Sequence, residues 1–120
     1  MPVTHVFAGF RVSDFDAAQA WYERLLGRPP DMRPHAAEAA WQLTADGWLY
    51  VVAAGEQDVA GGAVATLLVD DLDALVTEVQ KRGLRCDRIE EVGGGAGRKA
   101  IYSDPGGNVI GFGFVQPPRV

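Results

Sequence analysis

The amino-acid sequence predicts an α+β fold: two tandem βαβββ units that form a curled mixed-sheet cup with helices on its outer face. Three observations predict this fold. The segments 12–27 and 69–83 repeat one helix pattern. A strand-like run precedes each helix, and three more candidate strands follow it. A repeat of this size indicates two copies of one supersecondary unit, here about residues 1–54 and 62–120, in a single domain of 120 residues.

The two helix segments share their start and stop signals. Ser13 and Asp70 are suitable N-caps, and an aspartate follows each of them three residues later, in the capping-box position. Gly27 and Gly83 suit the position just after a helix end. Between these signals, apolar residues recur at helical spacing and predict one buried face per helix. These residues are Ala18, Trp21, Tyr22, Leu25 and Leu26 in the first helix, and Leu72, Leu75, Val76 and Val79 in the second.

Alternating apolar runs and turn signals predict the strands. The predicted strands are 4–12, a weak run at 31–36, 39–45 and 48–54 in the first unit, and 62–69, 84–92, 98–104 and 108–115 in the second. Tight turns at Asp46–Gly47 and Gly106–Gly107 separate the last two strands of each unit. Residues 55–62 link the units, and the glycine-rich stretch 90–99 is predicted to be a flexible hairpin connection and a candidate lid over the cup.

Composition limits the classes of partner. The formal net charge of −5 argues against nucleic acid or an anionic membrane as the main partner. No apolar run approaches the roughly 20 residues of a membrane span, and the first residues lack the pattern of a signal peptide. The single cysteine, Cys86, excludes an intramolecular disulfide framework. We therefore expect a cytoplasmic protein with no nucleic-acid and no membrane partner.

Two motifs give the chain a family resemblance. The tandem βαβββ pattern, with "RVSDFDAAQAWYERLLG" and "YSDPGGNVIGF", resembles the vicinal oxygen chelate superfamily, which includes glyoxalase I, bleomycin-resistance proteins and extradiol dioxygenases. The resemblance covers nearly the whole chain, and its motifs are specific for the fold rather than for an activity. It implies that the two units close a cleft, and that chains of this length form homodimers whose cleft can draw residues from both subunits.

The resemblance also implies where the metal enzymes of the superfamily hold their ligands. The corresponding positions here are Phe7, Val51, Val64 and Gly111. None of these side chains can bind a divalent cation. His5 points to the same face of its strand as Phe7, but one imidazole does not hold a catalytic metal. Both His5 and His35 are therefore interpreted as polar residues near the surface. We therefore expect no metal and no cofactor.

Strand alternation predicts the lining of the cup. On the fourth strand it assigns Leu49, Val51 and Ala53 to the cup, and Trp48, Tyr50 and Val52 to the helix side. The predicted ligand-binding residues are Phe7, Gly9, Arg11, Trp41, Val51, Val64, Thr66, Tyr102 and Gly111. Arg11 is the cationic anchor, or else it pairs with an acid at a dimer interface. Gly9 and Gly111 leave room for a ligand, and the aromatic residues offer stacking surfaces, although Trp41 fits the core equally well.

Three classes of function follow from these predictions. The preferred one is a metal-free binding protein that sequesters an amphipathic or aromatic antibiotic or metabolite in a dimeric cleft, so that resistance needs affinity alone. The alternative is a glyoxalase- or dioxygenase-like lyase or isomerase. The missing ligands disfavour its metal-dependent form, and a metal-free form would use Arg11 and Tyr102 to polarise a substrate. A structural or regulatory partner domain has no positive signal in the sequence.

Overall fold

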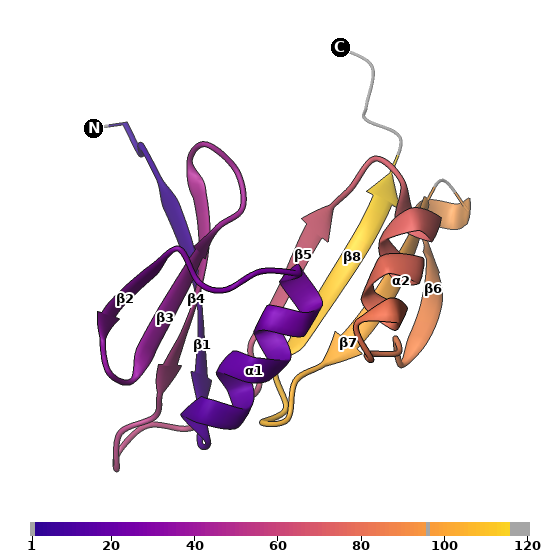
Figure 1. Ribbon diagram of the computed structural model, residues 1–120. Helices are drawn as coiled ribbons and strands as arrows, with labels where there is room; N and C mark the ends of the chain where they lie inside the picture. The colour runs from indigo at the N-terminus through magenta and orange to yellow at the C-terminus, as the bar shows by residue number, and fades with distance from the viewer. Residues whose placement is uncertain (1, 96, 116–120) are drawn as a thin grey trace.

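The protein, described here as a computed structural model for residues 2–95 and 97–115, consists of two similar units. In chain order the elements are β1 (Val6–Val12), α1 (Phe15–Leu26), β2 (Met32–His35), β3 (Glu38–Gln42), β4 (Gly47–Ala53), β5 (Val64–Leu68), α2 (Leu72–Lys81), β6 (Arg88–Val92), the short 3₁₀ helix η1 (Gly93–Gly95), β7 (Gly97–Ser103) and β8 (Val109–Val115). Figure 1 shows the two sheets beside each other, with α1 between them. The predicted α+β fold of two βαβββ units is confirmed.

The two sheets have equivalent topologies. Their strand orders are β1-β4-β3-β2 and β5-β8-β7-β6. In each, the first strand of the unit pairs in parallel with the last, and the other neighbours pair antiparallel. A parallel pair needs a crossover connection, which includes the helix in both units. β1 and β5 each lie at an edge of their sheet, and within the described residues no strand pairing joins one sheet to the other.

Both helices begin one residue later than the sequence predicted. The N-caps are Asp14 and Asp71, whose carboxylates accept hydrogen bonds from Ala17 N at 3.1 Å and Ala74 N at 3.0 Å. The predicted caps, Ser13 and Asp70, are therefore wrong, because the aspartate directly after each one caps the helix instead. The glycines that follow the helices have left-handed backbone, as predicted. No helix in the described part of the chain is long and apolar enough to cross a membrane.

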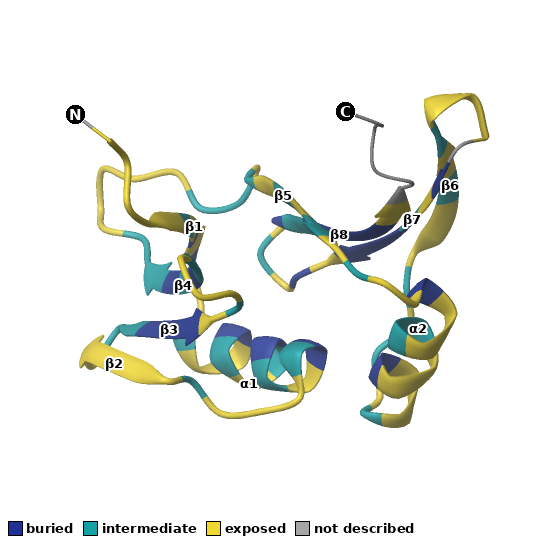
Figure 2. Cartoon of the chain, turned by 90° about the horizontal axis from the view of Figure 1, so that it is seen from above, coloured by how far each residue is buried: buried dark blue, intermediate teal, exposed yellow. Residues whose placement is uncertain are grey.

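One hydrophobic core runs through both units. Its members include Phe10, Tyr22, Leu49, Ile110 and Phe112, drawn from α1 and from strands of both sheets. Figure 2 shows buried residues on α1 and α2 and on strands of both sheets, such as β3 and β8. Each fully buried side chain of this size contributes about 1.5–3 kcal/mol. Burial therefore fixes which face of each sheet meets the helices, and the opposite face, here called the open face, is left for other contacts.

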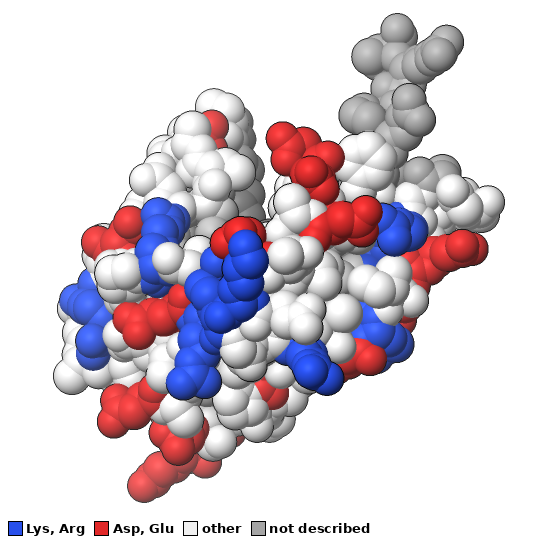
Figure 3. Space-filling model, turned by 45° about the vertical axis from the view of Figure 1, so that its right-hand side comes forward, with Lys and Arg blue, Asp and Glu red and all other residues white. Residues whose placement is uncertain are grey.

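Charged side chains lie mainly at the surface. On the side shown in Figure 3, acidic and basic groups are interspersed. Exposed ion pairs such as Arg98–Asp73, at 3.0 Å, join them. An exposed pair contributes about 0–1 kcal/mol, so these pairs contribute little to the stability of the fold.

The turn between β7 and β8 is polar and yet buried. Asp104 and Asn108 are the two buried polar residues of the described chain. The Tyr22 hydroxyl donates to Asp104 Oδ2 at 2.8 Å, and the other carboxylate oxygen accepts from the backbone amides of Gly106 and Asn108. Burial, and then the nearby Asp104 carboxylate, raise the pKa of Tyr22, so its hydroxyl remains a hydrogen-bond donor.

Asn108 connects this turn to the first unit. Its Nδ2 donates to Arg11 O at 3.0 Å and to Asp104 Oδ2 at 2.9 Å, and its Oδ1 accepts from Ala63 N at 3.0 Å. The turn also touches the linker directly, because a Cβ on Gly61 would lie 2.4 Å from Gly106 O. The two units are thus joined by buried hydrogen bonds as well as by the shared core.

The close approach at Gly61 gives a test of this junction. Gly61 and Gly62 both have positive φ, so alanine at either position costs roughly 1–2 kcal/mol of backbone strain. Only Gly61 faces the Gly106 carbonyl; a Cβ on Gly62 would meet nothing within 4 Å. We expect Gly61→Ala to lower the free energy of unfolding by about 1–3 kcal/mol more than Gly62→Ala. Urea denaturation measures both, and equal losses would show that the linker does not rest on the turn.

Candidate functional site

The open face of the first sheet begins with the alternation of β1. Phe10 and Val12 are buried in the core, whereas Phe7, Gly9 and Arg11 are exposed on the opposite face, as predicted. β4 runs parallel to β1 with Tyr50 opposite Gly9. The side chains that accompany Gly9 and Arg11 on the open face are Trp48, Tyr50 and Val52.

The prediction for β4 is therefore wrong by one residue. Leu49 and Val51 are fully buried in the core rather than exposed in the cup, because Val51 lies beside Phe10 of β1. Trp48, predicted to face the helices, lies on the open face and stacks on Phe7, with ring centroids 5.5 Å apart.

Aromatic rings cover part of this open face. A Cβ on Gly9 would lie 2.3 Å from Tyr50 Cζ, so the glycine makes room for the Tyr50 ring. The Phe7–Trp48 stack continues the aromatic surface along the same two strands. Phe7, Trp48 and Tyr50 thus offer flat apolar surfaces on the same face as Arg11, and of these Tyr50 lines the cavity together with Arg11.

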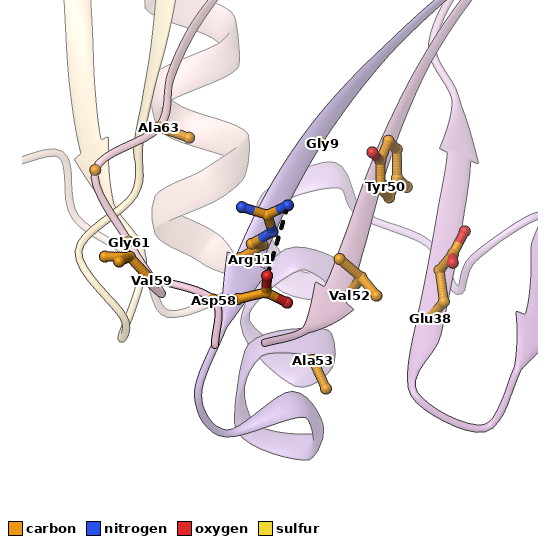
Figure 4. A pocket seen from close by; sticks show the side chains of 11 residues that line it. Gly9, Arg11, Glu38, Tyr50, Val52, Ala53, Asp58, Val59, Gly61 and Ala63 are labelled. Atoms are coloured by element: carbon orange, nitrogen blue, oxygen red, sulfur yellow. Dashed lines mark ion pairs between the residues drawn. The ribbon is translucent and has the colours of Figure 1, made fainter. Parts of the chain in front are cut away.

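A cavity of about 670 Å³ opens on this face. Figure 4 shows it between the ends of β1 and β4 and the linker that leads to the second unit. Its lining residues are Gly9, Arg11, Glu38, Tyr50, Val52, Ala53, Asp58, Val59, Gly61, Gly62 and Ala63. A concave site with converging polar groups beside apolar side chains is the usual shape of a small-molecule site, and here charged and phenolic groups make up much of the lining.

The polar groups of the cavity are one guanidinium, two carboxylates and a phenol. Arg11 Nη2 lies 3.8 Å from Asp58 Oδ1, with both side chains substantially exposed (58% and 39%). Such a pair is weak, so a ligand can replace either partner at little cost. The acid that pairs with Arg11 here belongs to the linker of the same chain, whereas the sequence suggested a ligand or an acid at a dimer interface.

Glu38, the second carboxylate, has a partner outside the cavity lining. Its Oε1 lies 3.1 Å from His35 Nε2. The Ala37 amide donates to His35 Nδ1, so a neutral His35 carries its proton on Nε2 and donates to Glu38. The other histidine, His5, is exposed beside Asp46, with Nε2 3.8 Å from Oδ1.

The open face of the second sheet differs from the first. Val64, Thr66 and Leu68 of β5 are exposed there, as the alternation predicts. The predicted free space at Gly111 is filled, because a Cβ on Gly111 would lie 2.8 Å from Lys99 Cδ. Gly111 therefore makes room for the aliphatic part of Lys99, as Gly9 does for Tyr50.

Two predicted aromatic site residues lie in the core instead. Trp41 is fully buried, packs against Tyr22 with ring centroids 6.1 Å apart, and donates from Nε1 to Arg28 O at 3.0 Å. Tyr102 is also buried and meets Phe112 edge-on. Burial, followed by the nearby Cys86, raises the pKa of Tyr102 to about 12. The prediction that these two rings line the cup is wrong, because both face the helices.

The glycine-rich connection does not cover the cavity. It forms η1 between β6 and β7, at the opposite edge of the second sheet from β5, and none of its described residues lines the cavity. The linker, predicted only to join the units, forms one wall instead. Asp58, Glu38 and Tyr50 supply polar side chains to the cavity and are among the lining residues that sequence reasoning missed.

Comparison with known proteins identifies the family. Residues 3–112 match the Glyoxalase/Bleomycin resistance protein/Dioxygenase superfamily. The chain belongs to this superfamily. The crystal structure of a glyoxalase/bleomycin resistance protein from Catenulispora acidiphila DSM 44928 is 44% identical and has a TM-score of 0.86, covering 95% of this chain and 100% of that one. A search of curated proteins found no match.

Two further structures of this superfamily fold are similar over nearly their whole length. TnmS3, an antibiotic binding protein from Streptomyces sp. CB03234, is 29% identical with a TM-score of 0.74, and the match covers 97% of this chain and 99% of that one. A bleomycin resistance determinant encoded on the transposon Tn5 is 25% identical with a TM-score of 0.73, over 96% of this chain and 100% of that one.

The metal that the superfamily's enzymes use does not fit these side chains. The equivalent strand pairings place Tyr50 beside Gly9 and Gly111 beside Thr66, so the counterpart of Gly111 in the first unit is Tyr50 rather than Val51. The four positions are then Phe7, Tyr50, Val64 and Gly111, which offer a single phenol oxygen. Among the described residues, no three His, Cys, Asp or Glu side chains gather as a ligand set. A catalytic metal needs about three protein ligands.

This donor set predicts the response of the protein to metal ions. We expect Zn²⁺, Ni²⁺, Fe²⁺ and Mn²⁺ to leave the thermal midpoint of chelator-treated protein unchanged within about 1 °C, because no bound ion stabilises the folded state. Elemental analysis of untreated protein should find well under one ion per chain. One tightly held ion per chain that survives dialysis, with a matching rise in the midpoint, would contradict the assignment of these positions.

Proposed function

We propose that this protein binds an amphipathic or aromatic small molecule, such as an antibiotic or a metabolite, without a metal and without converting it. The observation that supports the proposal most is the cavity on the open face of the first sheet. Its valines and alanines suit an apolar body, and Arg11, Glu38 and Tyr50 suit the polar groups that orient one. The predicted contacts of Phe7, Gly9, Arg11, Val64 and Thr66 with a ligand belong to this proposal, whereas Gly111 is covered by Lys99.

The aromatic residues support a ligand with a flat ring system. Tyr50 lies inside the cavity lining, and the Phe7–Trp48 stack lies on the same two strands. Stacking on such rings contributes about 0.5–1.5 kcal/mol per pair beyond the burial of area. A planar molecule with one charged group fits this combination better than a fully polar substrate does.

The comparisons support binding as the function. One similar structure is described as an antibiotic binding protein and another as a bleomycin resistance determinant, and both are similar across the full chain. Binding needs neither metal ligands nor a catalytic base. The metal-free enzyme considered from the sequence needs Tyr102 beside the substrate, and the burial of that ring disfavours it.

A second copy of the chain is proposed to complete the cleft. The edge strands β1 and β5 expose apolar side chains that a soluble monomer seldom leaves open: Val6 (63%) and Phe7 (49%) on β1, and Val64 (71%) and Leu68 (67%) on β5. In a two-fold dimer, β1 of each copy can lie along β5 of the other copy, so the same contact forms twice. Both edge strands of both copies are then covered, and the assembly stops at two copies. The open face of the first sheet would then lie next to the second sheet of the partner.

Binding is tested by titrating the protein with bleomycin and with a panel of aromatic antibiotics. Trp48 is the reporter, because it is the tryptophan on the open face, so its fluorescence should change on binding. Arg11→Ala should weaken binding about tenfold or more, since a charge-assisted hydrogen bond contributes about 1.5–3 kcal/mol.

The matched control is Arg98→Ala, which removes an exposed arginine that pairs with Asp73 of α2. It should leave affinity unchanged. If Arg11→Ala and Tyr50→Ala both bound every panel compound as the wild type does, the cavity would not be the site. Chemical conversion of a bound compound, detected by mass spectrometry, would contradict binding without turnover.

The dimer is tested at β5. We expect the double variant Val64→Lys, Leu68→Lys to sediment as a monomer while the wild type sediments as a dimer, because charged groups on an edge strand oppose pairing. Ile89→Lys is the control, since Ile89 is also exposed (45%) but lies on β6, the opposite edge of the same sheet. A wild-type monomer at all concentrations, or a double variant that remains dimeric, would refute this arrangement.

A further inference from the structure

We propose that Asn108, in the second unit, is a positioning residue for the cavity of the first unit. It holds the Arg11 backbone and the linker residues that form the cavity wall. The effect on affinity rests on the proposed function, whereas the effect on the wall can be measured without any ligand.

The argument starts from the Arg11 carbonyl. This oxygen accepts from Asn108 Nδ2 at 3.0 Å and from the Gly61 amide at 3.0 Å. The side chain of the same residue projects into the cavity and meets Asp58 of the linker. One residue of β1 is therefore fixed at its backbone by Asn108, while its guanidinium faces the ligand space.

The linker is held by the same turn. Asn108 Oδ1 accepts from Ala63 N at 3.0 Å, and the Gly62 amide donates to Gly107 O at 3.1 Å. Gly61 rests against Gly106 O with no room for a side chain. Four lining residues of the cavity, namely Arg11, Gly61, Gly62 and Ala63, are thus attached to residues 106–108.

The chemistry at position 108 requires an amide. Two donors must reach Arg11 O and Asp104 Oδ2, and one acceptor must receive the Ala63 amide. Asparagine supplies all three at the end of one short side chain. An aspartate would place an oxygen against two acceptors, and serine would be too short to reach both units.

Tyr22 provides a matched control within the same network. Its hydroxyl donates to Asp104 Oδ2 at 2.8 Å, on the α1 side of the turn. Tyr22→Phe therefore removes one buried hydrogen bond of the network and leaves the bonds to Arg11 and Ala63 in place. It reproduces a loss of stability without a loss of the wall contacts.

The ligand-free test is amide hydrogen exchange measured by NMR. In Asn108→Ala, we expect the Gly61 and Ala63 amides to exchange about tenfold faster or more than in Tyr22→Phe, after each variant is corrected for its global opening rate with amides of β7. Asn108→Ser, which keeps a polar side chain, is the second variant in case the alanine variant does not fold. Equal protection of Gly61 and Ala63 in the Asn108 and Tyr22 variants would overturn the proposal.

The ligand test uses bleomycin, and the bound panel compounds if there are any. Asn108→Ala should weaken binding about tenfold, and Tyr22→Phe should leave the dissociation constant unchanged at a temperature where both are folded. Unchanged affinity in Asn108→Ala would show that the wall is not positioned from the turn. Absence of binding by the wild type refutes the proposed function instead, and the exchange experiment then decides the role of Asn108 alone.

Discussion

The structure depends on a buried carboxylate that forms no ion pair within the described residues. Asp104 accepts four hydrogen bonds, from Tyr22 Oη, Asn108 Nδ2 and the amides of Gly106 and Asn108. A buried charge is tolerated only when its lone pairs are satisfied, so each of these donors must be in place for the turn to be buried at all. Two donors come from the turn itself, one from α1, and one from a side chain that also binds β1. Satisfying this one carboxylate therefore involves residues of both units of the fold.

The same requirement accounts for how the repeated units differ. The equivalent turn of the first unit, at Asp46–Gly47, is exposed, and its backbone closes by a bond from Leu43 N to Gly47 O. Among the described residues, it is the turn of the second unit that makes side-chain hydrogen bonds to the other unit. The open faces differ as well, because Gly9 accommodates Tyr50 whereas Gly111 accommodates Lys99. A duplicated scaffold thus carries an aromatic cavity on one sheet and a lysine on the other.

The sequence predicted what depends on local pattern. The periodicity of the sequence predicts both helices, the glycines at their ends and the alternation of β1. On β1 the assignment of faces is clear, because the charged Arg11 cannot share the core with Phe10 and Val12.

β4 has no charged residue to distinguish its two faces in this way. Trp48, Tyr50 and Val52 are as apolar as Leu49 and Val51, so either face could have met the helices, and a shift of one residue reverses every side chain. Trp41 and Tyr102 were misplaced for the same reason. The burial of Asp104 could not be predicted, because its donors lie 82 residues away in the sequence as well as next to it.

The placement of the cavity on an edge strand links ligand binding to assembly. β1 supplies Gly9 and Arg11 to the cavity, and on its other side it pairs with no strand of the described residues, although Arg11 O accepts from Asn108 Nδ2 and Gly61 N there. A copy of β5 placed along that edge would bring Val64 and Leu68 next to Phe7, where they would shield the Phe7–Trp48 stack from water. Shielding raises the contribution of every stacking contact and hydrogen bond in the cleft, because water no longer competes for them. Under the proposed function, the dimer and the ligand would then stabilise one another, and the affinity measured for a small molecule would rise with the concentration of the protein until the dimer is fully formed.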